Sequence, residues 1–152
     1  MRNTTTMIDP KAILKDAPIF SSFAVKDIDA ARQFYGKTLG LDIRDGQEPG
    51  TLEIHSREGN PVFVYPKEDH KPAVFTVLNL QIRDIDEAVD ALTGAGVRME
   101  HYDRPDGIKT DAKGVARGTG DQGGTQGPSI AWFQDPSGNI VSVMEVTVRP
   151  PD

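Results

Sequence analysis

The chain contains no cysteine, which is the most informative absence in its 152 residues. Without thiols it forms no disulfide bonds, holds no metal through thiolates and has no cysteine nucleophile. It also lacks an excess of basic residues, because 17 lysines and arginines stand against 23 aspartates and glutamates, giving a formal net charge of -6. Nucleic-acid-binding domains usually carry the opposite charge, so nucleic acid is disfavoured as a partner.

Long apolar runs are absent as well. No segment approaches the roughly 20 apolar residues that a transmembrane helix needs, and the opening residues MRNTTTMIDPK lack the apolar stretch of a secretion signal. We therefore expect a cytoplasmic protein with no membrane partner. Hydrophobic residues make up 37% of the chain, which suits one globular core, and 152 residues are too few for two independent domains.

The sequence contains an internal repeat of two similar segments. The segment AVKDIDAARQFYGKTLGLDI, beginning at Ala24, resembles QIRDIDEAVDALTGAGVRME, beginning at Gln81. In each copy an alternating apolar run predicts a strand, an aspartate then caps a helix, and glycine ends that helix. Three strand candidates follow in each copy, at residues 41–44, 51–55 and 61–65, then 97–102, 130–134 and 140–146. Since neither copy has enough strand to bury its helix and enclose a ligand, we expect the two to pair.

A glycine-rich segment at residues 103–128 contains the pattern G-x-G-x-x-G at Gly118, Gly120 and Gly123. The nucleotide-binding form of that pattern needs a strand before it and a helix after it. Here a polar loop precedes the pattern and more glycine follows, so nucleotide binding is disfavoured. A loop of this length is usually functional or mobile. We leave open whether it is a lid over a pocket or a disordered insert.

The order of these motifs resembles a known superfamily. FYGKTLGL occupies residues 34–41 of the first helix, and WFQDPSGN occupies residues 132–139 of the last hairpin. At these places they resemble the vicinal-oxygen-chelate superfamily, which includes glyoxalase I, extradiol dioxygenases, fosfomycin-resistance transferases and bleomycin-resistance proteins. The resemblance covers residues 18–147. It implies an α+β fold in which two paired βαβββ modules form a cup-shaped, partly open barrel, with the helices outside and the ligand inside.

The same resemblance implies a domain organisation. We expect a single domain over residues 1–152, with module 1 at about 18–66, module 2 at about 73–147, an N-terminal extension at 1–17 and the glycine-rich loop at 103–128. Related proteins commonly pair their modules across subunits as well as within one. A homodimer is therefore expected, and whether the modules pair within the chain or across the dimer stays open.

Metal-dependent members of the superfamily carry histidine or glutamate at four strand positions. We locate those positions in this chain by alignment on three motifs: the aspartate that opens each helix, the β-hairpin and the D-P-x-G-N turn. The four positions are Phe20, Val64, Val77 and Ser142. None of the four offers an imidazole nitrogen or a carboxylate oxygen, and a serine hydroxyl is a weak ligand for zinc, nickel, manganese or iron. We therefore expect no metal and no other cofactor, with Ser142 facing the cup where relatives place a glutamate.

Residues that share a strand face with these four positions are expected to line the cup, because side chains alternate along a strand. A mostly apolar lining with a few polar anchors suits a partly apolar or aromatic small molecule. Asn79 and Gln81 could instead form a satisfied polar pair, and Trp132 could instead pack in the core. The ligand-binding set that we predict is Phe20, Ser22, Val64, Val77, Asn79, Gln81, Trp132 and Ser142.

Two further residues are weak catalytic candidates. Leu52 and Ile54 are expected in the core, which sends Glu53 and His55 to the opposite face of their strand. Such a pair could work as a base with its orienting group, or as two ligands of an unorthodox metal site. The sequence contains no G-x-S-x-G pattern for a serine nucleophile. Whether the protein is an enzyme therefore remains open.

Three functions are compatible with these residues and motifs. The first is a small-molecule-binding protein without the usual metal ligands, comparable to the bleomycin-resistance proteins. The alternative is a glyoxalase-like or dioxygenase-like enzyme, that is, a lyase, isomerase or oxygenase with an unorthodox metal site or metal-free acid–base residues. The third is a stress or interaction protein with a vestigial cup. The identity of the ligand does not follow from the sequence.

Overall fold

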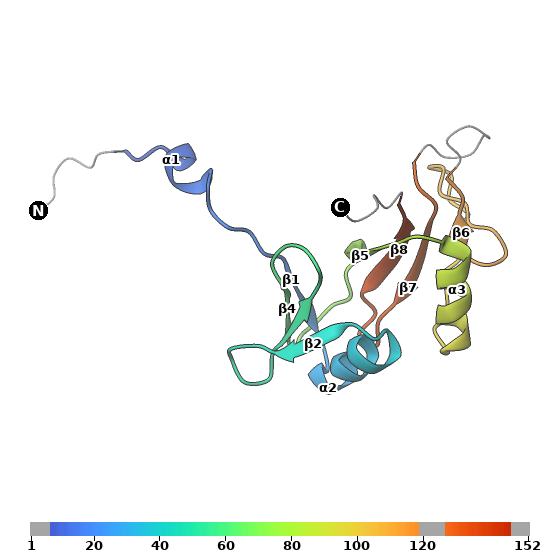
Figure 1. Cartoon of the computed structure of the whole chain (residues 1–152), viewed down its shortest axis with the longest axis horizontal. Coiled ribbons are helices and arrows are strands. Elements are labelled where there is room, and N and C mark those ends of the chain that lie inside the picture. Colours follow the sequence, from blue (N-terminus) through green and yellow to red (C-terminus); the bar gives the residue numbers. More distant parts are fainter. Residues whose placement is uncertain (1–6, 119–126, 147–152) are drawn as a thin grey trace, which may run out of the picture.

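Two four-stranded sheets form the body of the protein in a computed structural model, which describes residues 7–118 and 127–146 (Figure 1). The strand orders are β1-β4-β3-β2 and β5-β8-β7-β6. In each sheet the first strand of the module runs parallel to the last, and the remaining neighbours are antiparallel. The strands are β1 (Ser22–Val25), β2 (Asp42–Asp45), β3 (Leu52–His55), β4 (Val62–Pro66), β5 (Thr76–Ile82), β6 (Val115–Ala116), β7 (Ile130–Gln134) and β8 (Ile140–Glu145).

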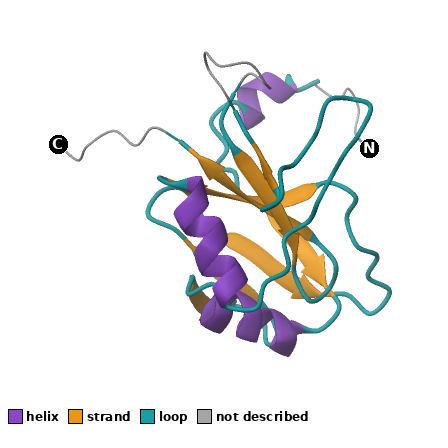
Figure 2. Cartoon of the chain, turned by 90° about the vertical axis from the view of Figure 1, so that its right-hand side faces the viewer, coloured by secondary structure: helices purple, strands orange, loops and turns teal. Residues whose placement is uncertain are grey.

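Each sheet is covered on its outer face by a helix, as Figure 2 shows. In module 1, α2 (Ile28–Ala31) continues directly into a π-helix, η1 (Arg32–Thr38). In module 2 the helix is α3 (Ile85–Gly94). Asp27 and Asp84 cap these helices through side-chain oxygens that accept backbone N–H groups of the first turn, as their sequence positions predict. The sheets do not close into a barrel, so the α+β fold with an open cup is confirmed.

A single hydrophobic core lies between the sheets and their helices. Burial of each large apolar side chain contributes about 1.5–3 kcal/mol, so this core dominates the stability of the fold. The two modules share it, because the ring of Phe34 on η1 lies 6.1 Å from the ring of Phe133 on β7, centroid to centroid. The buried apolar residues include Phe23, Val25, Tyr35, Leu52, Ile54, Val64, Ile85, Val89, Val115, Ala131, Phe133, Val141 and Val143.

The D-P-S-G-N turn does more than reverse the chain, because it fastens module 2 to module 1. The Tyr35 hydroxyl on η1 donates a hydrogen bond to Asp135 Oδ2 at 2.7 Å. Asn139 Nδ2 donates to the carbonyl oxygen of Ala24 on β1 at 2.8 Å. Burial, reinforced by the adjacent Asp135 carboxylate, raises the pKa of Tyr35 far above that of a free tyrosine. These two hydrogen bonds, Tyr35 to Asp135 and Asn139 to Ala24, connect residues about a hundred positions apart.

The strand predicted at residues 97–102 does not form, and this expectation was wrong. There Met99 makes an isolated bridge to Phe133. The edge strand of the second sheet is instead β6, which lies inside the predicted glycine-rich loop. Its Val115 is fully buried, and its backbone N–H donates to Asp111 Oδ1 at 2.9 Å. A two-residue strand among glycines carries too little periodicity to be recognised from sequence.

The N-terminal segment stands apart from this body. It contains a short helix, α1 (Pro10–Leu14), that has no buried residue, and Figure 1 shows it held away from both sheets. Ile19 lies before β1 and is 80% exposed, so it does not belong to the first strand. Within the described residues, no helix has the length and apolarity needed to cross a membrane.

Candidate functional site

The cup face of the first sheet is set by the register of its strands. Leu52 pairs with Val64, and Glu53 pairs with Phe63. Paired residues lie on the same face of a sheet, and Val64 is fully buried in the core beside Phe23, its partner on β1. The prediction that Val64 faces the cup was therefore wrong. A shift of one residue moves a side chain to the opposite face, and Phe63 occupies the cup side instead.

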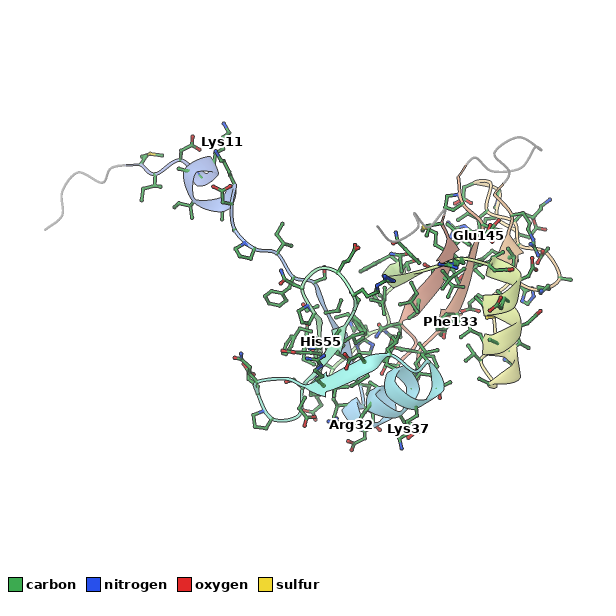
Figure 3. The ribbon with its side chains drawn as sticks, in the orientation of Figure 1. Lys11, Arg32, Lys37, His55, Phe133 and Glu145 are labelled. Atoms are coloured by element: carbon green, nitrogen blue, oxygen red, sulfur yellow. The ribbon has the colours of Figure 1, made fainter. Side chains whose placement is uncertain are left out.

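Four ionisable side chains gather on this face across β2 and β3. Glu53 Oε1 lies 2.8 Å from His55 Nε2, and both side chains are partly buried, opposite the core residues of their strand. His55 is labelled in Figure 3. Their partners in the sheet are Arg44 and Asp42, which form an ion pair at 2.8 Å. The hydrogen bond from Arg44 lowers the pKa of Asp42. An imidazole held by a carboxylate can accept or donate a proton, so acid–base chemistry is available here.

A cavity of about 480 Å³ opens beside this pair. Its volume lies within the range of small-molecule sites, roughly 300–1,000 Å³. Two carboxylates contribute to the lining and no basic side chain does, while the Phe63 ring stacks against Tyr65 with centroids 5.8 Å apart. The cavity is therefore both aromatic and acidic. The lining residues are Pro18, Phe20, Gln47, Glu48, Glu53, Asn60, Pro61 and Phe63.

A second cavity, of about 640 Å³, lies between β1 and the segment that joins the modules. Ser22 and Val77 both line it, so the structure brings these two predicted residues together. His70 also lines it, and its Nε2 is buried without a hydrogen-bond partner in the described part of the chain. Ser22 of this cavity pairs in the first sheet with Phe63, which lines the first cavity.

The cup face of the second sheet carries a row formed by Asn79, Ser142 and Trp132 on β5, β8 and β7. Ser142 is fully buried, and its hydroxyl donates to Asn79 Oδ1 at 2.6 Å. Trp132 packs edge-on against Tyr102, with ring centroids 5.5 Å apart. Gln81 is exposed on the edge strand. The alternative in which Asn79 pairs with Gln81 is not observed, since Asn79 accepts the hydrogen bond from Ser142.

Comparison with known proteins agrees with this architecture. The family model of the Glyoxalase/Bleomycin resistance protein/Dioxygenase superfamily matches residues 19–143. The chain belongs to this superfamily. No curated protein matches its sequence closely enough to count as a relative.

Solved structures of superfamily members share the fold. A glyoxalase/dioxygenase from Nostoc punctiforme is 14% identical with a TM-score of 0.61, over 96% of this chain and 100% of that one. TnmS3, an antibiotic binding protein from Streptomyces sp. CB03234, is 18% identical with a TM-score of 0.59, over 87% and 98%. A superfamily member from Sphaerobacter thermophilus DSM 20745 is 23% identical with a TM-score of 0.59, over 86% and 97%. At these identities the likeness is one of fold.

The side chains at the superfamily's metal positions do not fit a metal site in this chain. Phe20 lies before β1 and is 65% exposed, Val77 lines the second cavity, and Ser142 is hydrogen-bonded to Asn79. The fourth metal position was assigned to Val64. If it is reassigned to Phe63, as the strand register requires, its residue is again apolar. Across residues 7–118 and 127–146, no three histidine, aspartate or glutamate side chains come together as a metal cluster. Metal independence stays a prediction.

Several residues of the aromatic cavity were not predicted from the sequence. Phe63 was missed because both faces of β4 are apolar or aromatic, so only the register that pairs Glu53 with Phe63 shows which face meets the cup. Glu48 and Asn60 lie in loops, and no local pattern places a loop residue beside a strand. Asn60 Nδ2 donates to the carbonyl oxygen of Ile19 at 2.7 Å, which holds the chain before β1 against the β3–β4 hairpin.

Salt bridges tie residues 113–117 of the glycine-rich loop to helix α3. Both terminal nitrogens of the Arg117 guanidinium lie 2.8 Å from oxygens of Asp86, and Lys113 Nζ lies 2.8 Å from the same carboxylate. These hydrogen bonds, from Arg117 and then Lys113, hold the pKa of Asp86 well below its usual range. Residues 119–126, which include Gly120 and Gly123, lie outside the described part, so the choice between lid and insert stays open.

We expect Asp86→Asn to loosen the segment that carries β6 without unfolding the protein, because Asp86 holds Lys113 and Arg117 together. The pKa of Asp86 is lower in the folded chain than in the unfolded chain. Its contribution is therefore present above the usual aspartate pKa of about 3.9 and is lost as the pH falls toward the lower folded value. Hydrogen exchange at pH 7 should show faster exchange at Val115 in the variant.

The exposed aspartate of another ion pair provides the control for that measurement. Asp106→Asn, which removes the partner of Arg104, should leave exchange at Val115 unchanged. Equal protection of Val115 in the wild type and in Asp86→Asn would show that the salt bridges do not anchor the segment.

Proposed function

We propose that the protein binds a small aromatic molecule carrying a positive charge in the cavity on the cup face of the first sheet. The observation that carries this proposal is the lining of that cavity, where Phe20 and Phe63 stand beside Glu48 and Glu53 with no basic side chain among the lining residues. The aromatic rings can pack and stack against an apolar, aromatic ligand. The two carboxylates favour a cation over a neutral or anionic group.

Physical magnitudes support this choice of ligand. A cation over an aromatic face gains about 0.5–2 kcal/mol, and a carboxylate in a partly enclosed site adds to that attraction. Glu53 already accepts a hydrogen bond from His55, which holds its carboxylate in place before a ligand arrives. Preorganisation of this kind lowers the entropy that binding costs. No cofactor is required for binding of this kind.

The structural neighbours support binding more than they support a particular reaction. TnmS3 shares the fold and is described as an antibiotic binding protein, whereas the Nostoc punctiforme neighbour is described as a glyoxalase/dioxygenase. The superfamily therefore contains both modes on the same scaffold. In this chain the metal positions are apolar or already hydrogen-bonded, which favours the binding mode.

A thermal-melt screen tests the proposal. Fused-ring aromatic amines would be compared with alcohols of the same ring system, which are neutral. An amine at about 100 times its dissociation constant should stabilise the fold by about 2.7 kcal/mol, or roughly 5–10 °C, and its alcohol should do so less. Glu53→Gln and Phe63→Ala should each weaken the best amine about tenfold or more in calorimetric titrations.

Glu87→Gln is the matched control, because it removes the same charge from the exposed face of α3. Affinity for the amine should be unchanged in that variant. Equal stabilisation by amines and alcohols would contradict the cationic part of the proposal. Affinity that survives both cavity variants would place the ligand elsewhere.

The hydrogen bond between Glu53 and His55 supports a second candidate, an enzyme that uses this pair for acid–base chemistry. Every amine that passes the screen would be incubated with the protein and followed by nuclear magnetic resonance for product. Turnover that disappears in both His55→Ala and Glu53→Ala would favour the enzyme. Saturable binding without any product would favour the binding protein.

A further inference from the structure

The second cavity differs in charge from the first. Its volume of about 640 Å³ also lies within the range of small-molecule sites, roughly 300–1,000 Å³. Basic side chains line it at Lys67, His70 and Lys71, and the carboxylate of Asp69 lines it as well. Acidic residues outnumber basic ones in this chain, whose formal net charge is -6. A group of basic side chains around one cavity is therefore a distinct feature of the molecule.

Two polar groups of this lining have no partner in the protein. Lys67 forms an ion pair with Asp69, so these two charges neutralise each other. Lys71 has no ion-pair partner among residues 7–118 and 127–146. The Nε2 atom of His70 is buried and makes no hydrogen bond within the same residues. A buried polar atom without a partner is rare and costs stability, and a bound ligand can supply the missing hydrogen bond.

Hydrogen bonds hold the connector, defined here as residues 67–75, in place at this cavity. At its start, the backbone N–H of Lys67 donates to the carbonyl oxygen of Val25 on β1 at 2.9 Å. Further along, the backbone N–H of Ala73 donates to Asn139 Oδ1 at 3.4 Å. The backbone between these two points is therefore ordered before a ligand arrives, which lowers the entropy that binding costs.

We propose that the second cavity binds a small carboxylic acid with an apolar or aromatic body, and that Lys71 and His70 hold its carboxylate. Lys71 supplies the positive charge. The His70 ring is only partly buried, and a turn about its two-fold χ2 torsion exchanges Nε2 with Cε1 and frees the nitrogen to donate. Phe75 and Val77 line the same cavity and offer apolar surface to the body of the acid. This site does not rest on the proposed amine site in the first cavity.

The lining suits a carboxylate better than a phosphate. Phosphate sites commonly use arginine or the N–H groups of a helix N-terminus. Among the described residues that line this cavity there is no arginine and no helical residue. One unpaired lysine and one imidazole match the single charge and the two oxygens of a carboxylate. Ser22 and Thr76 also line the cavity, and their hydroxyls can donate further hydrogen bonds.

Calorimetric titration of the full chain gives the first test, with naphthoate and other arylcarboxylates each compared with its neutral primary amide. The best acid should bind at least about tenfold more tightly than its amide, and Lys71→Gln should weaken that acid about tenfold. Lys37→Gln is the matched control, because it removes the same charge from the exposed side of η1, where Figure 3 labels Lys37. Its affinity for the acid should equal that of the wild type. Equal affinity for acids and amides, tighter binding of the matching aryl phosphates, or affinity that survives Lys71→Gln would overturn the proposal.

The same titration separates this site from the proposed amine site. Glu53 lines the first cavity and not the second, so Glu53→Gln should leave the affinity for naphthoate unchanged. Loss of naphthoate binding in Glu53→Gln would place the acid in the first cavity and overturn this proposal. Failure of the amines to bind would contradict the proposed function and leave the acid site standing.

The variant His70→Phe distinguishes a binding role from a structural one. It keeps an aromatic ring and removes the unpartnered nitrogen, so the free protein should melt at or above the wild-type temperature. Its affinity for naphthoate should nevertheless fall about fivefold or more. The chain has 3 histidines, so nuclear magnetic resonance of the ring nitrogens can follow each one. Naphthoate should shift the His70 signals and leave those of His55 and His101 in place; unchanged His70 signals, or full affinity in His70→Phe, would overturn the assignment.

Discussion

Replacing Phe133 with alanine is expected to destabilise the fold by about 4 kcal/mol, which corresponds to a fall in melting temperature of roughly 8–16 °C. Phe133 is fully buried on β7 and contacts Phe34 of module 1. The loss therefore removes apolar burial and leaves a cavity at the place where the two modules share their core. Figure 3 labels Phe133 between β7 and the helical region of module 1.

Urea unfolding with two probes would check this expectation. Trp132, the single tryptophan, reports module 2 by fluorescence, whereas circular dichroism reports both modules. Because one core spans the modules, the two probes should give coincident transitions in the wild type. Phe133→Leu retains most of the volume and should cost less than about 1.5 kcal/mol. A loss below about 1 kcal/mol in Phe133→Ala would show that this residue does not support the shared core.

Tyr35→Phe is expected to cost about 2 kcal/mol, although it removes a single oxygen atom. That oxygen donates the 2.7 Å hydrogen bond to buried Asp135, and bonds to a charged group contribute more than neutral ones. The remaining partners of Asp135 are the backbone N–H groups of Ser137 and Asn139 and the Asn139 side chain, and they cannot replace the lost donor. Melting should fall by roughly 4–8 °C.

The dependence of this effect on pH has a definite sign. The pKa of Tyr35 is higher in the folded chain than in the unfolded chain, so its contribution is complete below a pH of about 10 and is lost as the pH rises further. The difference between wild type and Tyr35→Phe should therefore shrink above pH 10. Tyr65→Phe, on the cup face, is the control and should stay within about 0.5 kcal/mol of the wild type. Equal stability of Tyr35→Phe and wild type at pH 7 would show that the hydrogen bond from Tyr35 to Asp135 does not stabilise the fold.

The helix caps, the turn and most strand faces were predicted from the sequence, because each depends on residues that are close together in the chain. The aspartate caps at residues 27 and 84 and the turn at 135–139 are short-range features, and all three appear where the sequence predicted them. Strand faces were recovered where apolar and polar residues alternate, as in Leu52 and Ile54. On β4 every residue from 62 to 65 is apolar or aromatic, so periodicity did not distinguish its two faces and the choice of Val64 was wrong.

By itself the sequence determined that the chain builds two βαβββ modules and that they pair, and it predicts that the superfamily's metal positions carry no strong ligand. These conclusions depend on residue identity and spacing along the chain. The tertiary structure alone decided that Phe63 faces the cup, that Glu48 and Asn60 join it from loops, and that Tyr35 bonds Asp135 a hundred residues away. Long-range pairing and side-chain packing decide such contacts, because any one of them depends on elements that are distant in sequence.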